Sequence, residues 1–176
     1  MAINQAGDTL YLQGDFAAFG DKTRKGGAAV KTDGTLLPWT YELPSTTRCI
    51  AVSLDDKVVF SGNNTGIKWL TLDAITGERQ TADSPGGKPL YNFNDGKDEP
   101  AFSVYATGNI VYVGGGFKTG PDDKIQRIAK FVDGKLDTTF NNLDNGDFRP
   151  SDSVRGIYSV DGLLFYMGQF QTVGGK

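Results

Sequence analysis

Histidine is absent from the 176-residue chain, and this absence removes several classes of enzyme and metal site. Without it there is no Ser-His-Asp triad, no Cys-His dyad and no zinc site with an imidazole ligand. The single cysteine, Cys49, cannot form an internal disulfide or a multi-cysteine metal centre. Only oxygen donors remain as metal ligands, and these suit calcium or magnesium.

Long apolar runs and basic clusters are also missing. No run approaches the roughly 20 apolar residues that a membrane helix needs. The first residues, Met-Ala-Ile-Asn-Gln, lack the basic and apolar character of a signal peptide. The net charge is −3 and the basic residues are scattered, which does not fit a nucleic-acid surface. We therefore expect neither membrane insertion nor nucleic-acid binding.

Glutamate is scarce, whereas glycine and aspartate are plentiful. The chain holds 24 glycines, and among its 21 acidic residues only Glu42, Glu78 and Glu99 are glutamates. A glycine inside a helix costs about 1 kcal/mol relative to alanine, and aspartate favours turns and caps. No segment shows a helical period with caps. The composition predicts an all-β fold of short strands and tight turns.

Four segments repeat one pattern, in which a polar turn leads into an apolar strand that ends at a glycine. Aligned on Gly14, Gly62, Gly115 and Gly168, they are spaced by 48, 53 and 53 residues. Periods of about 40 to 50 residues are typical of β-propeller blades. The equivalent strands are expected at residues 10–12, 58–60, 110–113 and 163–166.

The flanking segments repeat as well and complete a unit of four antiparallel strands. First strands are expected at 49–54, 101–105 and 155–160. Two-residue turns then follow at 55–56, 107–108 and 161–162. Third strands are expected at 27–31, 67–72 and 125–132, and weaker fourth strands at 35–39, 78–81 and 135–140. The chain should thus form blades over 1–44, 45–97, 98–150 and 151–176, of which the first and last are incomplete.

The third unit carries the most specific motif. It reads Gly115-Gly-Phe117, then Arg127-Ile-Ala-Lys-Phe131, then Asp133-Gly-Lys-Leu-Asp137 and Phe140. This series closely resembles the delta-sixty repeat, a bacterial repeat family associated with β-propellers. The first unit matches in part, whereas the second departs most and looks more like kelch-type surface propellers. The resemblance implies a scaffold, and it implies no reaction and no fixed ligand residue.

The chain holds about three and a half such units, whereas a closed propeller needs about four to eight blades. We expect a portion of a longer propeller; the alternative is that copies of the chain complete a ring between them. In either case both end faces should expose apolar surface and unpaired strand edges. Further repeats of the same chain, or another protein, should cover these edges, and the isolated chain should associate or be poorly soluble.

The richest polar stretch spans residues 92–99 and is the only candidate for a metal site. Its oxygen-bearing side chains could serve a hard cation such as calcium: Asn92, Asn94, Asp95, Asp98 and Glu99. The spacing differs from an EF-hand, because Tyr91 stands where the first aspartate would be. We favour a solvated loop between blades, and we interpret the acidic residues at 122–123 and 144–147 in the same way.

Other patterns also favour a structural role. The run Gly114–Gly116 lacks the Gly-Lys-Ser/Thr ending of a phosphate-binding loop, so its glycines should let the strand leave a crowded blade centre. Acids beside glycines in turns should be exposed with ordinary pKa values, unlike the tuned pair of a glycosidase. Aromatic residues recur at similar repeat positions, which favours core packing over a sugar platform: Phe16, Trp39, Trp69, Phe117, Phe140 and Phe170.

These observations together predict a β-propeller that acts as a scaffold or interaction module, with no catalytic residue and no cofactor. By analogy with the fold family, we expect it on a secreted, cell-surface, phage-tail or adhesin protein, with a surface glycan or receptor as a further partner. One alternative is a propeller that binds or hydrolyses carbohydrate. Another is an assembly subunit that other copies complete.

Overall fold

The computed structural model describes residues 1–39, 47–52, 58–63, 69–78, 101–119, 125–133, 135–141, 150–174 and 176. Within these ranges the chain forms antiparallel β-sheets and turns, without an α-helix. The prediction of an all-β fold is therefore confirmed. Accordingly, no helix long and apolar enough to cross a membrane is found in the described part of the chain.

The first sheet has the strand order β1-β2-β5. It consists of β1 (Ala2–Ile3), β2 (Thr9–Gln13) and β5 (Gly27–Lys31). The loop from β2 to β5 holds a small hairpin of β3 (Ala18–Phe19) and β4 (Lys22–Thr23), which the sequence pattern did not predict.

The expected fourth strand at 35–39 is wrong, because only an isolated bridge joins Val30 to Leu36. Pro38 has no N–H to donate to a ladder. The chain then turns away from the sheet, and the Trp39 indole donates a 3.1 Å hydrogen bond to the Ala74 carbonyl. In the second sheet, the expected fourth strand at 78–81 lies almost entirely outside the described residues.

The second sheet comprises β6 (Thr47–Val52), β7 (Val58–Asn63) and β8 (Trp69–Asp73). The third comprises β9 (Ala101–Thr107), β10 (Ile110–Thr119), β11 (Ile125–Val132) and β12 (Lys135–Leu136). It is the one sheet of the described chain that has four strands, and its fourth strand is only two residues long. The last sheet is a hairpin of β13 (Val154–Val160) and β14 (Leu163–Gly168).

Strands are found at all four positions expected for the repeated strand, and β2, β7, β10 and β14 each pair with the strand that precedes them in the chain. The turn at Asp161 and Gly162 has φ values of 51° and 76°, as a two-residue hairpin turn requires. The turn expected at 107–108 lies one residue later, because Thr107 still pairs with Ile110. The turn expected at 55–56 lies outside the described residues.

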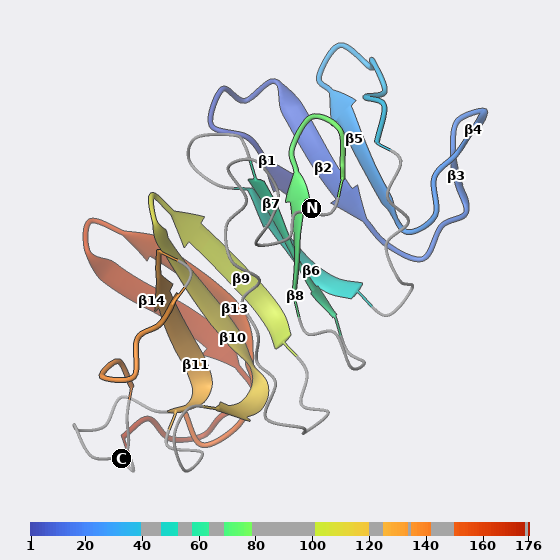
Figure 1. Ribbon diagram of the computed structural model, residues 1–176. Helices are drawn as coiled ribbons and strands as arrows, with labels where there is room; N and C mark the ends of the chain where they lie inside the picture. Colours follow the sequence, from blue (N-terminus) through green and yellow to red (C-terminus); the bar gives the residue numbers. More distant parts are fainter. Residues whose placement is uncertain are drawn as a thin grey trace.

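Successive sheets pack beside one another in chain order (Figure 1). The first strand of each later sheet makes the contact with the sheet before it: β6 packs against β2 and β1, β9 against β6, and β13 against β9 and β10. One apolar cluster joins the first two sheets: Tyr11, Ala29, Trp39, Ile50, Leu72 and Ala74. A second lies on the third sheet, with Cys49 of β6 packed against it: Ala101, Ala106, Val111, Val113, Phe117, Ile125, Ala129 and Phe131.

Gly114 lies at a close approach between the third and fourth sheets. A Cβ atom at this position would lie 2.6 Å from the Val154 Cγ1 atom and would also meet the Ser103 hydroxyl. Val154 is fully buried. Gly114 therefore has a structural role, although a different one from the predicted exit of the strand from a blade centre: it leaves room for Val154 of β13 on the face of β10.

Replacing Gly114 with alanine should lower the free energy of unfolding by about 1–3 kcal/mol, because the new methyl group overlaps atoms that are themselves packed. Urea denaturation followed by far-UV circular dichroism measures this change. The matched control is Gly14→Ala, where the nearest side-chain atom to the added Cβ, Cδ1 of Phe16, lies at an ordinary 3.4 Å. Equal effects of the two substitutions would contradict the close approach.

Candidate functional site

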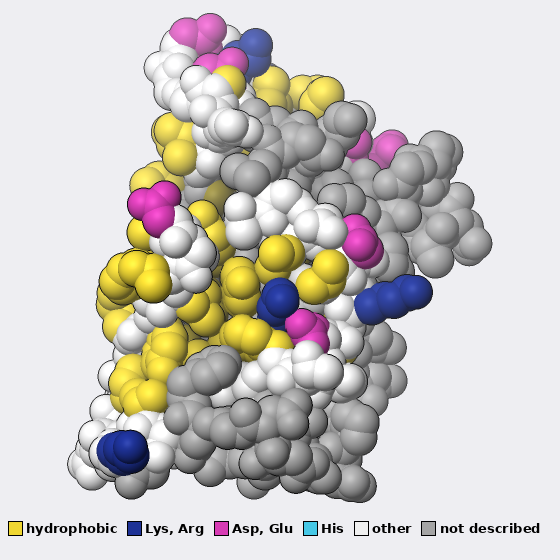
Figure 2. All heavy atoms as spheres, turned by 90° about the vertical axis from the view of Figure 1, so that its left-hand side faces the viewer, with side chains coloured by type: hydrophobic (Ala, Val, Ile, Leu, Met, Phe, Trp, Pro, Cys, Tyr) yellow, Lys and Arg dark blue, Asp and Glu magenta, His cyan; other side chains and the backbone are white. Residues whose placement is uncertain are grey.

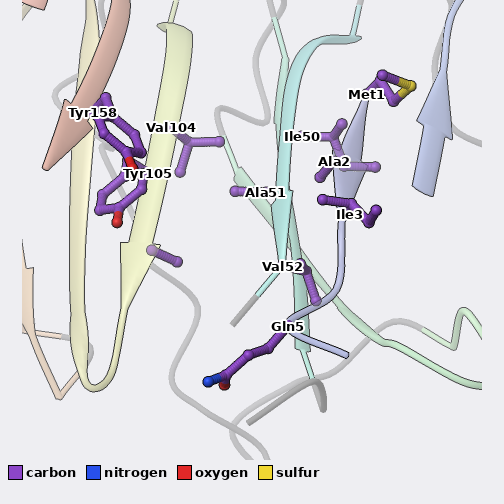
Figure 3. Close-up of a pocket in the computed structure, with 11 residues that line it drawn as sticks. Met1, Ala2, Ile3, Gln5, Ile50, Ala51, Val52, Val104, Tyr105 and Tyr158 are labelled. Atoms are coloured by element: carbon purple, nitrogen blue, oxygen red, sulfur yellow. The ribbon is translucent and has the colours of Figure 1, made fainter. Parts of the chain in front are cut away.

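A hollow of about 420 Å³ lies between the first strands of the four sheets (Figure 3). Residues of β1 line one side, β6 lies in the middle, and β9 and β13 line the other side. Its lining is almost wholly apolar: Met1, Ala2, Ile3, Gln5, Ile50, Ala51, Val52, Val104, Tyr105, Ala106 and Tyr158. No acidic or basic side chain is among these lining residues.

The polar groups of the hollow come mainly from two tyrosines. The rings of Tyr105 and Tyr158 meet edge to face with their centroids 5.1 Å apart. Burial, and secondarily the neighbouring Tyr158, raises the pKa of the Tyr105 phenol above its ordinary value. The phenol is therefore protonated at neutral pH and is available as a hydrogen-bond donor.

The predicted calcium loop at 92–99 lies outside the described residues, as do the acidic pairs at 122–123 and 144–147, so these remain predictions. Among the described side chains, no three His, Cys, Asp or Glu residues lie close enough together to hold a metal ion.

Several described aspartates depart from the ordinary pKa values expected of them. Hydrogen bonds from neighbouring groups lower the pKa of Asp8, Asp33, Asp137 and Asp152. For Asp33 and Asp152 the largest contribution comes from the backbone N–H of Thr35 and Ser153. A glycosidase acid needs the opposite shift, a raised pKa, so these carboxyls do not suit that role.

Asp137 belongs to a compact cluster formed by residues of the segment 130–140. Its carboxylate accepts hydrogen bonds from the Thr139 hydroxyl at 2.7 Å and the Lys130 ammonium at 3.1 Å. The Lys130 ammonium also lies 5.8 Å from the centre of the Phe140 ring, which packs against Tyr112. The conspicuous part of the motif thus ties β11 to the turn after β12, and its role is structural.

The structure describes the side chains of five of the six aromatic residues that were expected in the core. Trp39 and Phe117 are buried, and Phe16, Phe140 and Phe170 are half-buried. These five therefore do not form an exposed sugar platform. The side chain of Trp69 lies outside what the structure describes.

An apolar surface does lie elsewhere, on one face of the last hairpin, and we call it the hairpin face. It comprises five exposed side chains: Tyr158, Val160, Leu163, Phe165 and Met167. The pairs Tyr158 with Phe165 and Val160 with Leu163 are direct cross-strand partners, which places their side chains on the same side. Met167 shares that side with Phe165 by alternation along the strand. Figure 2, viewed from the side where β14 lies in Figure 1, shows hydrophobic side chains gathered over this region.

One residue of the hairpin face, Phe165, is exposed, whereas the residue at the same repeat position in the first unit is buried. Three residues before the aligned glycine stand Tyr11, Tyr112 and Phe165. Tyr11 packs against the second sheet and is only 3% exposed. Tyr112 is half-buried, whereas Phe165 is 52% exposed. A position that serves sheet packing earlier in the chain is therefore left open in the last hairpin.

Comparison with protein-family models finds no matching family, and comparison with curated proteins finds no significant match. The resemblance to the delta-sixty repeat therefore rests on the residues of the third unit.

Substituting Asp137 with asparagine should lower the free energy of unfolding by about 1 kcal/mol at pH 7, because the charge-assisted hydrogen bonds are lost. The native pKa lies below the unfolded value, so this contribution is present above the unfolded pKa and disappears as pH falls through the native one. The difference between wild type and Asp137→Asn should therefore shrink toward zero between about pH 5 and pH 2.

Denaturant titrations across this pH range measure the effect. Asp21→Asn serves as the control, because the Asp21–Lys22 ion pair is highly exposed and should contribute little at any pH. A difference between wild type and Asp137→Asn that stays constant down to pH 2 would show that the carboxylate charge is not the cause.

Proposed function

We propose that this chain is part of a non-enzymatic β-propeller that serves as a rigid scaffold or interaction module. The repeated second strand, the antiparallel sheets and their packing in chain order through first strands support this arrangement. We place the module on a secreted, cell-surface, phage-tail or adhesin protein, on the strength of the repeat resemblance.

The hairpin face is the observation on which the interaction role rests. It gathers large apolar side chains on a regular, two-stranded surface, whereas such side chains are normally scattered singly on soluble proteins. Phe165 and Tyr158 supply rigid aromatic area of the kind that dominates binding energy at protein interfaces. We propose that a protein partner covers this face.

The carbohydrate alternative is less well supported by the same surface. Sugar recognition combines an exposed ring with nearby hydrogen-bonding groups, whereas the neighbours of Tyr158 and Phe165 on this face are Val160, Leu163 and Met167. The aliphatic surroundings favour a dry protein interface over a hydrated sugar.

The double substitution Phe165→Ser and Met167→Ser tests the role of the hairpin face. Both side chains are already more than half exposed, so the unfolding midpoint should change little, by no more than about 1 kcal/mol in free energy. Binding of a hydrophobic dye such as ANS to the native protein should nevertheless fall strongly. Native near-UV circular dichroism establishes that the fold is intact.

Ile75→Ser is the matched control, because Ile75 is 66% exposed in the turn after β8, away from this face. Its substitution should leave dye binding unchanged. Unfolding of the double variant would mean that the face belongs to the core, and undiminished dye binding would mean that it is not the apolar surface. Glycan binding that is lost in the double variant would favour the carbohydrate alternative instead.

A further inference from the structure

We infer that the hollow between the first strands of the four sheets binds a small, uncharged, mainly apolar molecule that carries a hydrogen-bond acceptor such as a ketone oxygen. The inference goes beyond the proposed interaction role, because the hollow and the hairpin face share only Tyr158. It follows from the place of the hollow in the fold, from its lining, and from the two phenols on one of its sides.

The hollow lies along the edges of two sheets. Three successive residues of β6, 50–52, and three successive residues of β9, 104–106, line it. Because successive residues of a strand point to opposite faces, a space that meets all three of them runs along the edge of the strand. In the described sheets, β6 and β9 are both edge strands. A guest molecule can therefore enter the hollow without displacing a strand from either sheet.

Small side chains keep the hollow wide. Ala2, Ala51 and Ala106 come from three different strands, and each side chain ends at its Cβ atom. Figure 3 shows Val104 of β9 and Ala51 of β6 pointing toward each other across the space between the strands. The volume of about 420 Å³ lies within the range of about 300–1,000 Å³ that is typical of small-molecule sites. A molecule of one or two rings is therefore the size of guest that we expect.

The lining selects against charge. None of its residues has an acidic or basic side chain. An ion that entered the hollow would lose hydration without meeting a side chain of opposite charge. An apolar molecule would instead remove apolar surface from water, both its own and that of the lining, and this favours binding. The guest should therefore be uncharged and mainly apolar.

The two tyrosines supply hydrogen-bond donors on one side of the hollow (Figure 3). The edge-to-face contact between their rings holds Tyr105 and Tyr158 together. Within the described part of the chain, the Tyr105 hydroxyl makes no hydrogen bond. A protonated phenol donates its hydrogen to an acceptor, and a ketone oxygen on the guest can accept it. The polar end of the guest should therefore lie toward the tyrosines.

Titration of the chain 1–176 with Prodan, an uncharged fluorescent naphthyl ketone, tests the inference. We expect saturable binding with an emission shifted to the blue. Val104→Trp and Ile3→Trp introduce a large side chain from opposite sides of the hollow, so each should weaken binding by about ten-fold or more. Ile3 is 52% exposed, so this second variant should fold even where Val104→Trp does not. Ile75→Trp is the matched control, because Ile75 is exposed in the turn after β8 and should leave the affinity unchanged.

Displacement of Prodan by two competitors of similar shape tests the role of the phenols. The double variant Tyr105→Phe and Tyr158→Phe removes both hydroxyls and keeps both rings. It should raise the inhibition constant of acetophenone by about three- to ten-fold, as expected for the loss of a neutral hydrogen bond. The inhibition constant of ethylbenzene, which has no acceptor, should stay the same. An equal effect on both competitors would overturn the orientation of the guest toward the tyrosines.

The absence of saturable Prodan binding would overturn the inference, and so would equal weakening by Ile3→Trp and Ile75→Trp. Binding that is lost in the double variant Phe165→Ser and Met167→Ser would also overturn it, because the ketone would then lie on the hairpin face. Near-UV circular dichroism establishes that each variant is folded. Loss of the Prodan result together with an unchanged ANS result would remove the ligand site and leave the proposed interaction role standing.

Discussion

Burial of one sheet face by the next sheet is the constraint on which the rest of this structure depends. None of the described sheets has more than four strands, and a two-stranded sheet such as β13–β14 is at best marginally stable alone in water. Tyr11, Ile50 and Leu72 become a core only because two sheets meet there. The contact also accounts for Gly114, where a side chain would overlap the buried Val154 of the neighbouring sheet.

The strands themselves could be predicted because their signals are local. An apolar run between turn residues needs no knowledge of the rest of the chain, and β2, β7, β10 and β14 were located in this way. The fourth strand was less predictable, because it lies at the edge of the unit and depends on single residues such as Pro38. The β3–β4 hairpin was missed for the opposite reason: its two-residue strands are too short for any alternation to be visible.

The sequence predicted that apolar surface would be exposed, but it did not predict which residues would form that surface. The sequence analysis expects apolar surface at the end faces, yet Leu163, Phe165 and Met167 look in sequence like the apolar strands of the other units. Their exposure depends on what lies against the hairpin, which is a property of the assembled sheets. The local signal that was available is the repeat position itself, since Phe165 aligns with Tyr11 and Tyr112. The lowered pKa values of the aspartates could not be predicted from sequence either, because the local backbone geometry decides which carboxylate accepts hydrogen bonds.

The small β3–β4 hairpin occupies the connection between the second and third strands of the first sheet, and most of its residues are exposed. This connection can therefore hold additional ordered structure without disturbing the register between β2 and β5, which is continuous over five residue pairs. It is a natural site for insertion. Segments grafted between residues 18 and 23 would extend outward from the first sheet. The packing of that sheet depends on other residues, such as Tyr11 and Ala29. The first sheet can in this way carry longer loops while the register between β2 and β5 stays the same.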